Sequence, residues 1–563
     1  MGFNTFKLCL YVPDETLFDI ADEMGMLLWL ELPLWQPTMT PALRELTMRE
    51  YSAILCRLHH HPSIVIVSLG CELDQQTGAD LLSELGSALR FWMPNVLRCD
   101  NSGSSEAYGG DLGSGGDFYD YHFYCEPHYF QDLIDHFQRA YQLPKPWIFG
   151  EFSDADTLRD FSQLASATWW INGPFTFERD ELTWLSGFAG RLADAGVHDG
   201  GAALTGIARQ QAQAVRKFIL ERVRLNFVGG GYVVTGWKDT PIATSGILDD
   251  QDQLKFDSKA WRMFNNDVVL LLDRPRCRHW VNGGDRPRYL DGYVFWADEV
   301  VDLRLILVNG GPPVERAQLT CSILNRSAHL DLLLDFVTLV EDVSVLALSV
   351  SLVEGANQIR ASLLAIDKCL CETRWDLLSI SPAARTHALA QVAALPSQID
   401  AALLSDVSAG ASAIVWLPAV HSSFTHPMPF WRESIHVFQP HPFWEHVPQD
   451  GFADMRFFSV ATDFAIDLVK LHGWIEHNCL CENNAIELTP IWRRFDARAM
   501  VWHDYLVEVR VGRGRLFIST LRFAGGLGQQ PHGLEDNPMG CLLLSRLLDL
   551  VEMDAAAANI DPV

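Results

Sequence analysis

The chain of 563 residues lacks any apolar run that approaches the ~20 residues needed to cross a bilayer as a helix. Its first residues, Met1 to Thr5, lack the charged and apolar regions of a secretory signal peptide. Internal repeats and low-complexity linkers are absent as well. From these absences we expect no membrane partner, and a cytosolic location is favoured.

Basic residues are few in comparison with acidic ones. The 43 lysines and arginines face 71 aspartates and glutamates, which gives a formal net charge of −28. A surface of this charge repels nucleic-acid phosphates and anionic membranes. Nucleic acid is therefore not an expected partner, and a neutral substrate fits better than a polyanion.

The overall composition is that of an ordinary globular protein, with 48% hydrophobic and 20% charged residues. The length predicts three or four domains at about 150 residues each. The 12 cysteines are scattered through apolar segments, which favours reduced thiols over a disulfide framework. The 18 tryptophans suit a protein that stacks sugars, although most of these rings should simply lie in the core.

Residues 1–275 alternate between short apolar strands and amphipathic helical stretches, which is typical of a (β/α)₈ TIM barrel. Strands covered by helices on both faces are continuous apolar runs, as Ser63–Leu69 is. Only seven strands are counted, so we expect an α/β barrel that lacks its first strand. The strand candidates are Phe3–Leu8, Met26–Leu32, Ser63–Leu69, Val96–Cys99, Phe118–Phe123, Pro146–Gly150 and Gly231–Trp237.

Two further domains are predicted after the barrel. Residues 276–375 contain short β-rich segments separated by turn signals such as Asn309–Pro313, which predicts a β-sandwich. From 376 to 563 helical and strand patterns alternate again and predict a small α/β domain. In it, Ala401–Ser408 is typical of a helix, and Val507–Ser519 is typical of a hairpin that turns at residues 512–514.

Two glutamates follow apolar strand candidates in a similar way. Glu72 comes three residues after Ser63–Leu69, and Glu151 comes directly after Pro146–Gly150. Barrel enzymes carry catalytic groups at the C-terminal ends of strands. Glycosidic cleavage needs one protonated carboxyl group and one carboxylate, and a separation of about 5–5.5 Å gives retention. We interpret Glu72 and Glu151 as this pair; the alternative is two ordinary rim glutamates.

The segments around these glutamates resemble the barrel of glycoside hydrolase family 2, which includes β-galactosidases, β-glucuronidases and β-mannosidases. The resemblance implies that Glu72 is the general acid/base after the fourth barrel strand and that Glu151 is the nucleophile after the seventh. The similar segments are Met1–Lys7, Asp22–Trp29, His61–Glu72 and Trp147–Glu151.

The resemblance implies further residues that bind substrate. His122 and Tyr124 match a His-x-Tyr segment that hydrogen-bonds the nucleophile and the sugar; the alternative is a buried histidine and a core tyrosine. Trp237 is similar to the aromatic floor of the sugar subsite, with core packing as the alternative. Asp239 and Asn101 also lie at strand ends, where they could bind hydroxyl groups.

The chain departs from the family pattern at two of these positions. Cys71 stands where the family has an asparagine that hydrogen-bonds the sugar 2-hydroxyl, and a thiol is a weak donor. Lys7 stands where the family usually has arginine, which keeps the charge but loses the planar fork. Family 2 enzymes also carry a jelly roll and an immunoglobulin-like domain before the barrel, so we expect this chain to be N-terminally truncated.

Other signals are interpreted as structural. The C-terminal domain looks like an amidotransferase-like domain, on the segments Ala413–Pro418, Phe430–Trp431 and Gly512–Arg515, but without a nucleophilic cysteine, so we expect it to be non-catalytic. The pairs Cys369/Cys371 and Cys479/Cys481 are either zinc ligands or half-buried strand thiols, and we favour the thiols. The run His59–His61 precedes a buried strand in the family, and we expect no metal there.

Taken together, these patterns predict a retaining, exo-acting β-glycosidase that needs no cofactor and acts on a carbohydrate by double displacement. The alternative is a catalytically impaired carbohydrate-binding or scaffold protein that keeps the barrel, which Cys71 and Lys7 favour. The sugar, its linkage and assembly into a homo-oligomer stay open.

Overall fold

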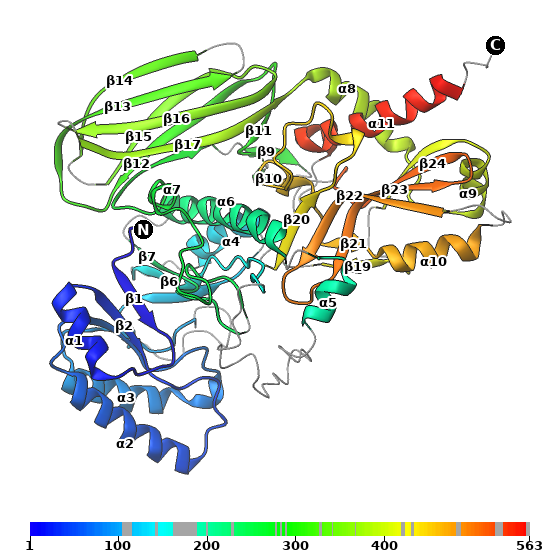
Figure 1. Cartoon of the computed structure of the whole chain (residues 1–563). Coiled ribbons are helices and arrows are strands. Elements are labelled where there is room, and N and C mark those ends of the chain that lie inside the picture. The colour runs from blue at the N-terminus through cyan, green and yellow to red at the C-terminus, as the bar shows by residue number, and fades with distance from the viewer. Residues whose placement is uncertain are drawn as a thin grey trace.

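The computed structural model describes residues 1–103, 115–125, 127–140, 145–161, 188–198, 201–226, 230–241, 243–275, 278–281, 284–287, 290–325, 329–339, 342–365, 368–417, 423–428, 433–479, 486–523 and 533–558. No helix within these ranges combines the length and apolarity needed to cross a membrane. Figure 1 shows three regions along the chain: the N-terminal strands and helices, a two-layered β-region, and a C-terminal sheet with helices.

The N-terminal region contains seven strands, at the positions that the sequence predicts. The strands are β1 (Thr5–Leu8), β2 (Leu27–Glu31), β3 (Ile64–Ser68), β4 (Leu97–Cys99), β5 (Tyr119–Phe123), β6 (Trp147–Phe152) and β7 (Gly231–Val234). The helices between and after them are α1 (Glu15–Met24), α2 (Pro41–Leu58), η1 (Gln75–Thr77), α3 (Ala79–Trp92), α4 (Pro127–Ala140), α5 (Phe188–Asp194), α6 (Ala202–Asn226) and α7 (Ser258–Arg262).

Local sequence explains where these elements begin and end. The Asp14 side chain accepts a hydrogen bond from the Thr16 amide and caps the start of α1. Gly25 ends the same helix with φ of 70°, a left-handed conformation that glycine adopts without strain. Strand β3 is buried along most of its length, as expected for a continuous apolar run.

The seven strands are divided between two parallel sheets, with orders β1-β2-β3-β4 and β5-β6-β7. Within the described ranges no ladder joins β4 to β5 or β7 to β1, so the fold there is mixed α/β with several sheets and no closed barrel. The sheets nevertheless meet, because the Asp117 amide donates to the Arg98 carbonyl at 2.9 Å. The (β/α)₈ barrel therefore stays a prediction.

The middle region consists of two layers that share one core and are antiparallel except for the parallel pair β11–β17. One sheet has the order β15-β12-β8 and the other β11-β17-β16-β13-β14, and both contribute to a single cluster of buried side chains. Strands β9 and β10 pair separately. The strands are β8 (Val268–Asp273), β9 (Arg278–Val281), β10 (Gly284–Pro287), β11 (Val294–Trp296), β12 (Val300–Asn309), β13 (Val314–Asn325), β14 (His329–Leu339), β15 (Asp342–Ser351), β16 (Gly355–Ala365) and β17 (Lys368–Ile380).

These layers extend beyond residues 276–375 on both sides. Strand β8 begins at Val268, and β17 ends at Ile380. The sequence did not separate β8 from the preceding region because every residue of this strand is buried, as in a parallel strand covered by helices.

The C-terminal region contains a seven-stranded mixed sheet with helices. Its elements are α8 (Pro382–Gln391), η2 (Val392–Ala394), α9 (Ala401–Ser408), β18 (Ser412–Trp416), β19 (Thr425–Pro427), β20 (Ser434–Phe438), η3 (Pro442–Trp444), η4 (Phe458–Val460), β21 (Phe464–Ile466), α10 (Leu468–Asn478), β22 (Ile486–Asp496), β23 (Trp502–Val511), β24 (Gly514–Ser519), η5 (Leu534–Asp536) and α11 (Pro538–Ala558). The expected hairpin is present as the antiparallel pair β23–β24. Pro418 and Phe430–Trp431 lie outside the described residues, so the amidotransferase-like assignment stays a prediction.

The C-terminal sheet contacts the segment that follows β6. Arg498, between β22 and β23, pairs with Asp156 at 2.7 Å and with Glu433 at 3.1 Å. Burial raises the pKa of Asp156 to about 7, with Arg498 opposing the rise. The Gln211 side chain of α6 accepts a hydrogen bond from the His436 amide on β20 at 3.0 Å. The end of β6 is thus supported from the C-terminal region as well as from its own sheet.

Asp120 on β5 joins the two parallel sheets. One carboxylate oxygen accepts hydrogen bonds from the Ser102 hydroxyl at 2.7 Å and the Gly103 amide at 3.0 Å, both after β4. The other oxygen accepts from the Gly150 amide on β6 at 2.7 Å. A side chain at position 150 would collide with this carboxylate, which explains the glycine before Glu151.

We predict that Asp120→Ala destabilises the fold by at least about 3 kcal/mol, because three donors lose their acceptor and each buried unsatisfied group costs about 1–3 kcal/mol. Urea denaturation measures this loss. Asp14→Ala is the matched control, since it removes a carboxylate that also accepts from a backbone amide but is exposed, and it should cost clearly less stability than Asp120→Ala. Equal losses in the two variants would contradict the role of Asp120.

Candidate active site

Glu72 and Glu151 lie at the ends of strands that belong to different sheets. Glu72 follows β3, and its φ of 49° places it in the left-handed region, where a non-glycine residue is strained. Glu151 lies within β6, one residue before the strand ends at Phe152. Sequence reasoning placed Glu151 just beyond the strand, a difference of one or two residues.

His122 on β5 brings the two glutamates together. Its Nδ1 atom lies 2.9 Å from Oε1 of Glu72 and 3.6 Å from Oε2 of Glu151. These two oxygens are therefore separated by at most the sum of the two distances, about 6.5 Å. Burial lowers the pKa of His122, but hydrogen bonding to Glu72 and the charge of Glu151 outweigh it and raise that pKa. One imidazole nitrogen thus lies next to both carboxylates.

Glu151 is surrounded by groups that favour its ionised form. The Tyr124 hydroxyl donates to Oε2 at 2.8 Å, and the Lys7 ammonium donates to Oε1 at 3.3 Å. The Cys9 thiol lies 3.5 Å from the same Oε1. Burial raises the pKa of Glu151, but Lys7, His122 and Tyr124 together hold that pKa below its usual value.

Glu72 is held by two donors. His122 contacts one carboxylate oxygen, and the indole N–H of Trp35 donates to the other at 3.1 Å. Burial raises the pKa of Glu72, but these two hydrogen bonds outweigh it and leave the pKa below its usual value. Both glutamates are therefore carboxylates at neutral pH in this arrangement.

Lys7 on β1 is the central cation of the site. Its ammonium lies 2.9 Å from the Glu31 carboxylate, 3.3 Å from Glu151 and 2.9 Å from the Ser102 hydroxyl. Burial lowers the pKa of Lys7, but Glu31 and Glu151 outweigh it and hold that pKa well above its usual value. Lys7 stays charged and neutralises carboxylates from two sheets.

Cys71 is buried beside this cluster. Its backbone bridges Trp35 on one side and Ser102 on the other, which fixes the turn before Glu72. A hydrogen bond with Cys9, followed by burial, raises the pKa of the Cys71 thiol. Position 71 therefore presents an uncharged thiol, which is only a weak donor.

Asn101 and Asp239 bind other groups of the protein itself. Asn101 is buried, and its amide exchanges two hydrogen bonds with the backbone of Leu73, at 2.8 Å and 2.9 Å. Asp239 forms a buried ion pair with Lys255 at 2.6 Å. Both contacts favour a structural role over binding of sugar hydroxyl groups.

Trp237 has a different environment. The residue is 53% exposed, and its ring packs edge-on against Phe6 with centroids 4.9 Å apart. This exposure disfavours the core-packing alternative and leaves indole surface free for a ligand.

Sequence reasoning missed several groups of the site. Glu31 is fully buried at the end of β2, and Trp35 and Ser102 follow β2 and β4. The pattern that identified Glu151, an apolar strand ending in a carboxylate, also occurs at Leu27–Glu31. Ser102 carries no comparable signal, because its role depends on contacts with Lys7 and Asp120.

The site also contains groups that could hold a metal. Cys71, Glu72 and His122 form one such group, and Cys9, Glu31 and Glu151 form another. In the second group Lys7 already supplies positive charge to both carboxylates. The sequence predicts that the protein holds no metal, and these groups neither support nor contradict that prediction.

The cysteine pairs do not present matched ligands among the described residues. On β17, Cys369 is exposed and Cys371 is buried, because the strand shifts register between them. Cys479 follows helix α10 rather than lying in a strand, and Cys481 is outside the described residues.

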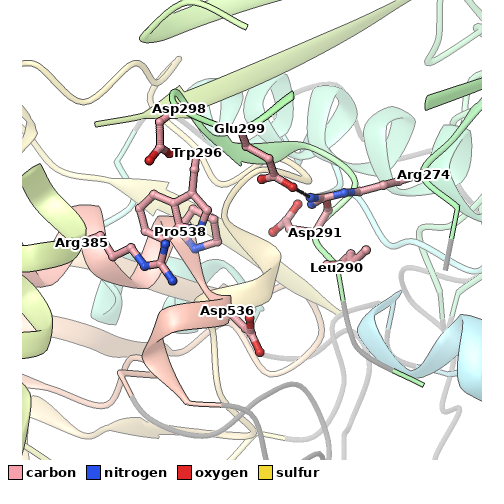
Figure 2. Close-up of a pocket in the computed structure, with 9 residues that line it drawn as sticks. All are labelled: Arg274, Leu290, Asp291, Trp296, Asp298, Glu299, Arg385, Asp536 and Pro538. Carbon is pink, nitrogen blue, oxygen red and sulfur yellow. Dashed lines mark hydrogen bonds and ion pairs between the residues drawn. The ribbon is translucent and has the colours of Figure 1, made fainter. Parts of the chain in front are cut away.

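A separate pocket of about 300 Å³ lies between the middle region and the C-terminal helices, as Figure 2 shows. On its walls Arg274 pairs with Glu299 at 2.6 Å, and Arg385 stacks on Trp296. The lining residues are Arg274, Leu290, Asp291, Trp296, Asp298, Glu299, Arg385, Asp536 and Pro538. None of the predicted site residues belongs to it, so the candidate active site is the cluster around Glu72 and Glu151.

No known protein-family model matches this chain, and no curated protein matches it. Among solved structures, it is similar to β-glucuronidase 2 of Bacteroides uniformis covalently bound to cyclophellitol-6-carboxylate aziridine, with 13% identity and a TM-score of 0.34, over 68% of this chain and 42% of that one. A putative β-galactosidase of Bacteroides fragilis shares 13% identity with a TM-score of 0.35, over 68% of this chain and 50% of that one. B. uniformis β-glucuronidase 3 shares 12% identity with a TM-score of 0.35, over 92% of this chain and 58% of that one.

These structural neighbours are glycosidases, and the chain spans less than two thirds of the length of each. At this level of similarity they show neither the family nor the activity of this chain.

We predict that Lys7→Met raises the pKa of Glu151, because the substitution removes the ammonium that favours the carboxylate. Infrared difference spectra between Lys7→Met proteins with and without Glu151→Gln isolate the titration of this carboxyl group. Lys7→Arg keeps the charge and should move the pKa less. An unchanged pKa in Lys7→Met would show that the other donors alone set it.

Proposed function

We propose that this protein is a retaining, exo-acting β-glycosidase of the family 2 type. The observation that carries the proposal is the contact of both Glu72 and Glu151 with Nδ1 of His122, which limits their facing oxygens to about 6.5 Å. Retaining enzymes have carboxyl groups about 5–5.5 Å apart, and inverting enzymes about 6.5–9.5 Å apart. The upper limit here only touches the shortest inverting separation, so retention fits better.

The surroundings of Glu151 suit a nucleophile. Its carboxylate is kept ionised by Lys7, and Tyr124 fixes its orientation through a hydrogen bond of 2.8 Å. A nucleophile must be ionised when the substrate binds, and this one is. Glu151 attacks the anomeric carbon while Glu72 gives its proton to the glycosidic oxygen, so the glycosidic C–O bond breaks as the covalent glycosyl-enzyme forms.

Glu72 serves as the acid in this first step and as the base in the second. Glu72 must be protonated before it can donate, although its hydrogen bond with His122 favours the carboxylate. A glycosidic oxygen that enters next to Glu72 replaces this bond and disfavours the carboxylate, since apo hydrogen bonds rearrange in the substrate complex. After the leaving group departs, Glu72 activates the water that releases the sugar.

The substrate we propose is a β-linked carbohydrate, with the exposed face of Trp237 as the floor of the sugar subsite. The reaction needs no cofactor, because two carboxyl groups supply the nucleophile and the acid/base. The net charge of −28 favours a neutral sugar.

We predict that an activated 2-deoxy-2-fluoro β-glycoside labels Glu151. The fluorine destabilises the oxocarbenium-like transition states of both steps, and a good leaving group keeps the first step accessible, so the ester accumulates. Peptide mapping should place the label within Pro146–Asp154. Glu151→Gln should abolish labelling, because a neutral amide cannot attack.

Glu72→Ala is the contrasting variant. It should still be labelled by activated substrates, which need no acid, and added azide should restore its turnover. Labelling of another segment, or azide rescue of Glu151→Gln in place of Glu72→Ala, would overturn the roles. If no sugar in a panel labels the protein, the carbohydrate-binding or scaffold function takes the place of the enzyme.

We predict that Cys71→Asn increases kcat/KM on aryl β-glycosides by up to about 100-fold, because a preorganised donor to the transition state is worth about that much. Cys71→Ser is the control, since its hydroxyl donates but is too short to reproduce the amide. No change on any glycoside would show that position 71 does not contact the sugar.

A further inference from the structure

Two histidines and a glutamate meet between helix α1 and the turn before β3. Nε2 of His60 lies 3.7 Å from Oε1 of Glu15, and Nε2 of His61 lies 3.9 Å from the same oxygen. All three ligand atoms lie within 4.8 Å of one another. His61 precedes β3 and Glu72 follows it, so this cluster is separate from the candidate active site.

His61 is oriented as a metal ligand would be. Its Nδ1 lies 2.7 Å from the Asp22 carboxylate, which also accepts from the Ser63 amide at 2.8 Å. Because the Asp22 carboxylate is placed to accept from both the Ser63 amide and Nδ1–H of His61, the neutral imidazole in this arrangement carries its lone pair on Nε2.

That lone pair has no hydrogen-bond partner among the described residues, although the His61 side chain is only 1% exposed. A buried imidazole nitrogen without a partner is costly unless something binds it. A carboxylate behind a histidine, with the opposite nitrogen free, is the usual arrangement around a bound metal ion.

Glu15 is held in a corresponding way. Arg57 donates to Oε2 at 2.8 Å, which leaves Oε1 for the two histidines. His60 is 54% exposed at its side chain, so an ion and its water can reach the cluster from solvent.

Against the expectation from the sequence that His59–His61 binds no metal, we propose that Glu15, His60 and His61 bind a divalent transition-metal ion, Zn²⁺ in the first instance, with water as the fourth ligand. Two imidazoles and one carboxylate are a zinc donor set that leaves a position for water. Ligand atoms about 2.0–2.1 Å from a tetrahedral ion lie roughly 3.3 Å apart, so the observed 3.7 Å and 3.9 Å must close by a few tenths of an ångström. The ion would tie α1 to the turn before β3.

The experiment is equilibrium binding of Zn²⁺ and Co²⁺ to the metal-free chain, with the Co²⁺ absorption spectrum as a second readout. We expect one tight site whose Co²⁺ spectrum lacks a thiolate charge-transfer band, because the ligands are nitrogen and oxygen. Zn²⁺ should also raise the Tm, since an ion that binds only the folded state stabilises it.

His59→Ala is the matched control for His60→Ala. The two histidines are neighbours in the chain, but Nδ1 of His59 bonds the Cys56 carbonyl at 2.7 Å and is not part of the cluster. His60→Ala and Glu15→Gln should each weaken Zn²⁺ binding at least about tenfold and remove the Tm shift, whereas His59→Ala should change neither.

Three results would overturn the proposal. Equal weakening in His59→Ala and His60→Ala would indicate chelation by the histidine run as a whole. A thiolate band would place the ion on Cys9 or Cys71 instead. A chain that binds no Zn²⁺ at micromolar concentration would leave the buried nitrogen of His61 without this explanation.

Discussion

The buried ammonium of Lys7 is the interaction on which the candidate site depends. It lies within 3.4 Å of groups on β2, β5 and β6 and of Ser102 after β4, so it joins the ends of strands from both sheets. Glu31 and Glu151 would repel each other without a cation between them. Since breaking a buried ion pair leaves an uncompensated charge, the position of Lys7 constrains both carboxylates.

A chain of hydrogen bonds extends this constraint to the backbone. Lys7 donates to Ser102, Ser102 donates to Asp120, and Asp120 accepts from the amide of Gly150. The residue after Gly150 is Glu151, so the carboxylate is fixed from the side-chain end and from the backbone end. The lack of space for a side chain at position 150 follows from the same network. Preorganisation of this kind is what electrostatic catalysis requires.

Side chains from outside the two parallel sheets also bind the segment that follows Glu151. The buried Arg216 of α6 donates to the carbonyl of Ser153, two residues after Glu151, at 3.0 Å. Arg498 from the C-terminal region pairs with Asp156 in the following segment. The C-terminal region, expected to be non-catalytic, therefore contributes to the structure behind the site. This gives it a role even without chemistry of its own.

The positions of the seven strands, with Glu72 after one of them and Glu151 near the end of another, could be predicted from the sequence, because a buried strand is a local apolar run and a carboxylate near its end is visible locally. Which side chains meet at these strand ends depends on the folding of distant segments against one another. Lys7 and Glu151 are 144 residues apart. Leu27–Glu31 shows the local pattern of a strand that ends in a carboxylate, but nothing local pairs Glu31 or Ser102 with Lys7. Asn101 shows the converse, since its place at a strand end was correct but its amide turns to the backbone of Leu73. The ends of strands can be predicted from hydrophobic periodicity. The direction in which a buried polar side chain points depends on its hydrogen-bond partner, which is often distant in the sequence.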